Sequence, residues 1–73
     1  MQKVIITGIS GVLGKALAKK YKSLGCHVIG VTRRTDFSDP NVDDIIVSEQ
    51  RSIEDAQTIL SHKPDILFLN AGQ

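Results

Sequence analysis

Residues 7–14 read TGISGVLG, and this stretch decides the fold. It follows the β-branched run Val4-Ile5-Ile6, which is typical of a strand buried on both faces. It precedes a segment in which apolar residues recur at the helical spacing of three and four, namely Leu13, Ala16, Leu17, Tyr21 and Leu24. The helix is expected to end at Gly25, where a left-handed C-cap suits glycine. We therefore predict a strand, a glycine-rich turn and a helix.

Three further apolar runs, at residues 28–31, 45–47 and 66–69, are typical of strands. The last run, Ile66-Leu67-Phe68-Leu69, is the most apolar and is predicted to be fully buried. A second helix, ending near residues 61–63, is indicated by the spacing of Ile53, Ala56, Ile59 and Leu60. The order β-α-β-β-α-β favours a parallel sheet with right-handed crossovers. We predict an α/β fold of three layers, half of a Rossmann-like fold, with the strand order 3-2-1-4.

Length and composition restrict the class of protein. The 73 residues are 41% hydrophobic and 23% charged, which fits a single small globular domain over residues 1–73. The net charge of +1 gives no reason to expect nucleic acid or a membrane surface as a partner, and no apolar run approaches the length of a membrane span. The only cysteine, Cys26, cannot form an intramolecular disulfide, so the cytoplasm is the simplest compartment.

The three glycines of residues 7–14 have the spacing of a phosphate-binding turn. Gly8 permits a tight turn, Gly11 leaves room for the backbone to approach a pyrophosphate, and Gly14 lets the helix pack closely on the strand. The first N–H groups of the helix and its dipole would then face the anion. The alternative is a tightly packed turn without a ligand. The strand before the turn and the helix after it favour binding of a dinucleotide.

At this point the chain resembles the short-chain dehydrogenase/reductase family. Residues 7–14 are similar to the TGxxGxxG form of its extended and atypical members, whereas the commonest members carry TGxxxGxG and would have glycine at Val12, which leaves the subfamily open. Residues 67–72, LFLNAG, resemble the NAG segment after the fourth strand of the family. The two motifs bracket nearly the whole chain.

The resemblance implies two groups of cofactor-binding residues. One would line the pyrophosphate and the adenosine ribose, and it comprises Gly8, Ser10, Gly11, Val12 and Leu13, with Gly14 completing the motif. The other would lie along the cofactor toward the nicotinamide-side ribose, and it comprises Asn70, Ala71 and Gly72. A plain polar turn after a buried strand is the alternative interpretation of Asn70, Ala71 and Gly72.

The end of the second predicted strand indicates which nicotinamide cofactor is preferred. An acidic residue there would accept hydrogen bonds from the ribose 2′-hydroxyl and repel a 2′-phosphate. The chain instead has Arg33 and Arg34, with no carboxylate before Asp36, and arginine can pair with a phosphate through two hydrogen bonds. We predict NADP(H) over NAD(H), with Arg33 as the main contact and Arg34 or Ser10 assisting. The alternative is that both arginines are solvated loop charges.

No catalytic residue and no metal site is predicted. The family resemblance implies a Tyr-x-x-x-Lys pair, but Tyr21 is the only tyrosine and Gly25 stands four residues after it. Tyr21 is therefore expected to be a packing residue. Cys26 and His27 are neighbours in a strand and would point to opposite faces, and His27 and His62 lack a cluster with metal-ligand spacing.

The predicted strand order leaves the fourth strand at an edge of the sheet, with unpaired backbone groups beside apolar side chains. We expect a homodimer joined near residues 66–69, or else aggregation. Three functions remain open at this point. The chain is a module that binds NADP(H) without its own catalysis, a truncated fragment of a longer NADP-dependent oxidoreductase, or an interaction protein that keeps the fold and no longer binds nucleotide.

Overall fold

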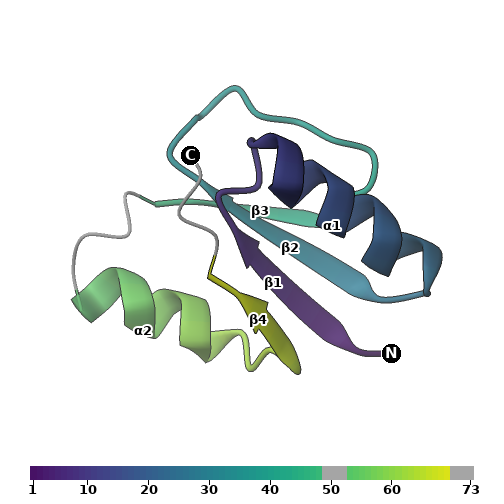
Figure 1. The fold of residues 1–73 in the computed structure, drawn as a ribbon. Coiled ribbons are helices and arrows are strands. Elements are labelled where there is room, and N and C mark those ends of the chain that lie inside the picture. Colours follow the sequence, from purple (N-terminus) through teal and green to yellow (C-terminus); the bar gives the residue numbers. More distant parts are fainter. Residues whose placement is uncertain (49–52, 70–73) are drawn as a thin grey trace.

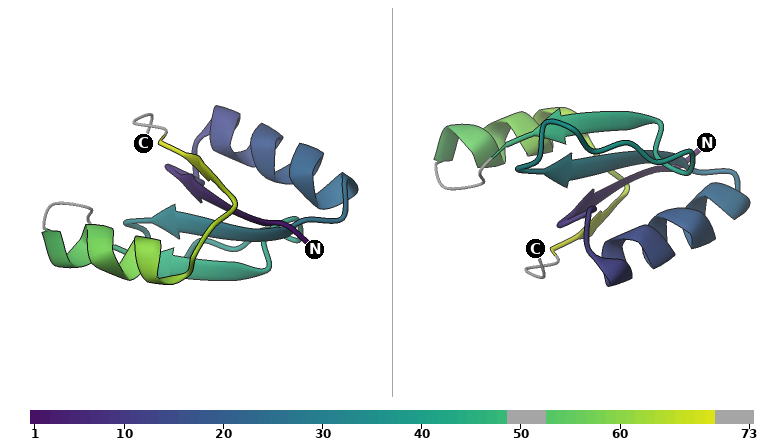
Figure 2. Two further views of the ribbon diagram at one scale, coloured as in Figure 1. Left: turned by 90° about the horizontal axis from the view of Figure 1, so that it is seen from below. Right: turned by 90° about the horizontal axis from the view of Figure 1, so that it is seen from above.

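A computed structural model of the chain describes residues 1–48 and 53–69, and its element order is the one predicted (Figure 1). The elements are β1 (Lys3–Thr7), α1 (Val12–Ser23), β2 (His27–Thr32), β3 (Asp44–Val47), α2 (Ile53–Ser61) and β4 (Ile66–Phe68). All strand pairs are parallel and the sheet has the order β3-β2-β1-β4, which confirms the predicted order 3-2-1-4. Helix α1 covers one face of the sheet and α2 the other, so the α/β fold has the three predicted layers (Figure 2).

The core lies on both faces of β1, as its uninterrupted apolar run predicts. Val4 and Ile6 belong to the cluster under α1, whereas Ile5 belongs to the cluster under α2, and all three are fully buried. Alternate residues of a strand point to opposite faces, so a strand without polar positions can only lie between two layers. The chain after β2 also covers the α1 face, where Phe37 and Val42 pack on the cluster.

The residues of α1 that face the sheet differ in part from those predicted. The buried positions are Gly14 and Ala18, with Leu17 and Tyr21 half-buried beside them. Three predicted positions are exposed instead: Leu13, Ala16 and Leu24. Glycine and alanine have almost no side chain, so they allow the helix axis to approach the sheet, and the larger residues fall to the flanks of the contact.

The end of α1 is the predicted glycine cap. Gly25 has a φ of 84°, in the left-handed region that glycine adopts without a steric penalty. Its N–H donates to the Lys22 carbonyl over 3.0 Å, and the Cys26 N–H donates to the Tyr21 carbonyl over 3.0 Å. These two bonds form a Schellman motif, which satisfies the last carbonyls of the helix and directs the chain into β2.

The prediction that residues 66–69 are fully buried is wrong. Ile66, Leu67 and Phe68 are half-buried, and Leu69, which follows the strand, is 81% exposed. Among the described residues β4 pairs with β1 alone, so it is an edge strand. The apolar run has the composition of a central strand, but composition does not reveal how many neighbours a strand has.

Candidate functional site

The site begins where β1 ends, in a turn that two glycines shape. Gly8 has a φ of 64°, and its carbonyl accepts the Gly11 N–H over 3.1 Å. A Cβ at Gly14 would lie 2.5 Å from the Gly8 carbonyl oxygen and 2.8 Å from the Ile9 Cα. Gly14 therefore lets the first helical turn lie directly against the glycine turn at the end of β1.

The first turn of α1 is open to solvent. Gly11 is the N-cap, its position has no side-chain capping bond, and the first turn holds no acidic residue. The first N–H groups of an α-helix have no carbonyl partner within the helix, and the dipole adds a partial positive charge there. Val12 is 90% exposed and Leu13 is 59% exposed, so their side chains do not close this end. The arrangement is suited to an anion.

The end of β2 is attached directly to the glycine turn. The Ile9 N–H donates to the Val31 carbonyl over 3.2 Å, which brings the turn beside the residues that follow Val31. Thr32 is buried, and its hydroxyl accepts the Arg34 N–H over 3.1 Å. This bond shapes the chain where it leaves the sheet.

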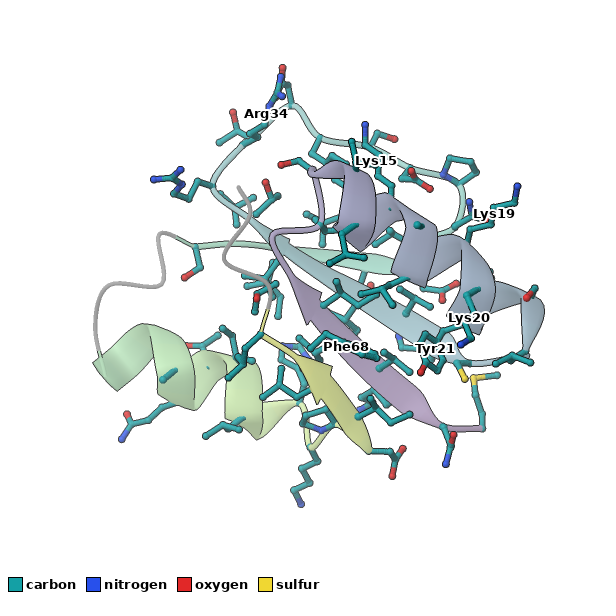
Figure 3. The ribbon with its side chains drawn as sticks, viewed as in Figure 1. Lys15, Lys19, Lys20, Tyr21, Arg34 and Phe68 are labelled. Carbon is teal, nitrogen blue, oxygen red and sulfur yellow. The ribbon has the colours of Figure 1, made fainter. Side chains whose placement is uncertain are left out.

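Both arginines after β2 are exposed. The Arg34 Nε lies 3.4 Å from an Asp36 carboxylate oxygen, and both side chains are mostly exposed, so solvent screens this pair. Arg34 lies on the loop that leaves β2, at the same end of the sheet as the start of α1 (Figure 3). The site therefore combines backbone amides with basic side chains.

The end of β4 completes this edge of the sheet. The Thr7 hydroxyl donates to the Phe68 carbonyl over 3.2 Å and joins the ends of β1 and β4. These two strands are parallel, but the connecting helices on either side of them change faces, since α1 lies on one face of the sheet and α2 on the other (Figure 2). In open α/β sheets ligands bind outside the carboxyl ends of strands at such a point. Asn70, Ala71 and Gly72, the other predicted contacts, lie outside the described residues.

Comparison with known proteins decides the family. Residues 4–73 match the NAD dependent epimerase/dehydratase family. The chain belongs to this family. It is also similar to "Dehydrogenase/reductase SDR family protein 7-like" of Dictyostelium discoideum, with 38% identity over 89 residues, 94% of this chain and 28% of that protein. These matches confirm the predicted relationship to short-chain dehydrogenases and reductases.

A solved structure supports the fold of this epimerase/dehydratase family member. "4-hydroxyisoleucine dehydrogenase complexed with NADH" is 23% identical, with a TM-score of 0.63, and the match covers 92% of this chain and 31% of that one. The chain thus spans about three tenths of the length of either relative. It resembles the N-terminal nucleotide-binding half of an NAD-dependent dehydrogenase or epimerase.

The other titratable residues considered from the sequence do not gather at this site. The rings of Tyr21 and Phe68 are 5.4 Å apart between centroids, so Tyr21 packs α1 on β4 (Figure 3). Cys26 is buried. Within residues 1–48 and 53–69 no group of three or more His, Cys, Asp or Glu could hold a metal ion. No helix in the same ranges has the length and apolar character to cross a membrane.

Sequence reasoning missed two residues that support the site, Ile9 and Gly30. Ile9 is fully buried although it lies inside the turn, and its side chain rests on Gly30 of β2. A glycine within an apolar strand is a known mark of close approach by another segment, so Gly30 carried the signal that could have identified the contact.

Proposed function

We propose that this chain binds a nicotinamide dinucleotide at the glycine turn and prefers NADP(H). The observation that carries the proposal is the amino end of α1, which has no side-chain cap and opens beside the β1–β4 pair, where the connecting helices change from one face of the parallel sheet to the other. Membership of an NAD dependent family supports the class of ligand, as does the neighbour solved with NADH.

The diphosphate is proposed to accept hydrogen bonds from backbone amides of Ser10, Val12 and Leu13. Gly11 has a different role, because its N–H already donates to the Gly8 carbonyl. Its missing side chain would let the diphosphate approach the backbone. Gly8 and Gly14 would contribute by shaping the turn. Asn70, Ala71 and Gly72 are proposed to lie toward the nicotinamide-side ribose.

The preference for NADP(H) is proposed to come from Arg33, with Arg34 or Ser10 assisting. The glycine turn is bonded to Val31, so a nucleotide held by the turn would place its adenosine ribose near the residues after β2. Arginine there provides hydrogen-bond donors and charge for a 2′-phosphate. A carboxylate at the same place would select the free 2′-hydroxyl of NAD(H).

A thermal-shift titration with NADP⁺, NAD⁺, ATP and FAD in parallel tests the class of ligand, because binding to the folded state must raise Tm.

Arg33→Asp should weaken NADP⁺ binding by about tenfold or more and change NAD⁺ binding little. The control is Lys63→Asp, which makes the same charge change at an exposed position just before β4. Equal loss of both cofactors in Arg33→Asp would reject the preference, and no Tm shift with any nucleotide would favour the interaction protein.

We also propose that residues 1–73 form one cofactor-binding domain that supplies no catalytic side chain, in a cytoplasmic protein. Tyr21 packs against Phe68, which supports a structural role for this tyrosine. The oxidoreductase chemistry of the family would then depend on residues of a longer protein. A homodimer formed through the β4 edge is the proposed assembly.

A further inference from the structure

Ile9 is enclosed by glycines from two different elements. A Cβ at Gly30 of β2 would lie 2.7 Å from the Ile9 Cγ1, 2.9 Å from its Cβ and 3.0 Å from its Cγ2. A Cβ at Gly14 of α1 would lie 2.8 Å from the Ile9 Cα. Real Cβ atoms do not come this close to other carbons, so both positions exclude every larger residue unless the turn moves.

Polar and apolar contacts hold Ile9 in the same place. The side chain is 0% exposed and belongs to the cluster of Val4, Ile6 and Val28 beneath α1. The backbone N–H is bonded to Val31, two residues before Arg33. One residue thus fastens the glycine turn to both the core and the end of β2.

We infer that Ile9 is a positioning residue for the dinucleotide, and that Gly30 sets how deeply the glycine turn sits on β2. The inference rests on the proposed function. A dinucleotide would span the amides of Ser10, Val12 and Leu13 and the arginines after β2, so its affinity depends on the distance between these two places. The contact between Ile9 and Gly30 fixes that distance, although neither side chain would touch the ligand.

Gly30→Ala tests this role. The new methyl group meets Ile9 and should push the turn away from β2, which raises the Kd for NADP⁺ about tenfold in folded protein. The amide resonances of residues 10–13 should shift in the absence of ligand. Ile9→Ala removes two of the three carbons that the methyl meets. The double variant should therefore bind better than the two single losses would predict.

Gly25→Ala is the matched control. Gly25 has a φ of 84°, and an added Cβ there meets nothing within 4 Å, so alanine strains the backbone at the far end of α1. We expect Tm to fall by about 4–8 °C, with the Kd of the folded protein and the amides of residues 10–13 unchanged.

The outcomes separate the two proposals. A higher Kd and shifted turn amides in Gly30→Ala, with neither change in Gly25→Ala, would support the role of Ile9. If the wild-type chain binds NADP⁺ and the two glycine variants have equal Kd values, the role of Ile9 is rejected and the proposed function stands. If the wild-type chain binds no dinucleotide, the proposed function is rejected and the role of Ile9 in binding falls with it.

Discussion

Gly14 lies against the backbone of Ile9 and Gly30 against its side chain, whereas Gly8 and Gly25 bend the chain with positive φ angles. The first pair is needed for space and the second for backbone conformation. Alanine is consequently unfavourable at all four positions, but for different reasons, and the four substitutions should have different consequences for the glycine turn.

Gly14→Ala tests whether the steric effect of a new methyl group outweighs the higher helix propensity of alanine. Alanine in a helix interior is favoured over glycine by about 1 kcal/mol, which by itself predicts stabilisation. The new methyl group would lie 2.5 Å from the Gly8 carbonyl oxygen, a backbone atom that cannot rotate away. Overpacking costs about 1–3 kcal/mol, so we expect a net loss of unfolding free energy in urea titrations. Lys15→Ala, at the next and exposed position, should be close to neutral, and a more stable Gly14→Ala variant would contradict the packing.

At the residue scale the sequence predicts the glycine turn itself better than it predicts the buried residue that supports the turn. The turn could be predicted because a β-branched run, three spaced glycines and a helical pattern occur in succession. Ile9 could not, since a residue between two glycines belongs to no periodic pattern, and its side chain rests on Gly30, which is 21 residues away in the sequence.

At the scale of elements, order and strand type were predictable and burial was not. The alternation of helices and strands fixes a parallel sheet through the handedness of crossovers. The exposure of Leu13, Leu24 and residues 66–69 depends on which segment covers each element. An apolar pattern in the sequence does not identify that segment.

A charged side chain, the carboxylate of Asp43, connects α1, β2 and β3. Asp43 lies just before β3, and its carboxylate accepts hydrogen bonds from the Lys22 Nζ and the Val28 N–H. Its own N–H donates to the Val28 carbonyl over 2.8 Å. The bond from Lys22, and after it the bond from Val28, hold the pKa of Asp43 below its usual 3.8, although partial burial opposes them.

The sign of the pH dependence follows from this lowered pKa. A carboxyl that is more acidic in the folded state stabilises the fold above its unfolded pKa, and the contribution is lost as the pH falls through the folded pKa. Asp43→Asn should therefore be less stable than wild type at neutral pH, with a difference that shrinks below pH 3.8. Urea unfolding between neutral pH and about pH 2 checks this. Asp36→Asn, at an exposed carboxyl, is the control, and a difference that stays constant with pH would contradict the role of the Asp43 charge.

At the scale of the whole molecule the two faces of the sheet are covered from solvent to different extents. The α1 face has α1 and the segment around Phe37 and Val42, whereas α2 contributes one fully packed residue, Ile59, among those whose side chains are described. Both edges of the sheet expose apolar residues. Ile45 and Val47 are exposed on β3, and at the β4 edge three apolar residues are half-buried and Leu69 follows them in solvent. Among residues 1–48 and 53–69 no second strand pairs with β4, so this edge has both unpaired backbone groups and apolar side chains, the two features that promote pairing between chains.

We expect the 73-residue chain to associate with itself through this edge, and Leu69→Lys to weaken the association. Burial of one leucine contributes about 1.5–3 kcal/mol, so a lysine there should raise the dimer dissociation constant by about tenfold or more, and a charge on an edge also opposes strand pairing. Sedimentation equilibrium over a range of concentrations measures the effect. Leu24→Lys is the matched control, since Leu24 is also mostly exposed but is the C-cap residue of α1 and not part of the strand edge. A monodisperse monomer at high concentration, or equal weakening by both substitutions, would show that β4 is not the contact.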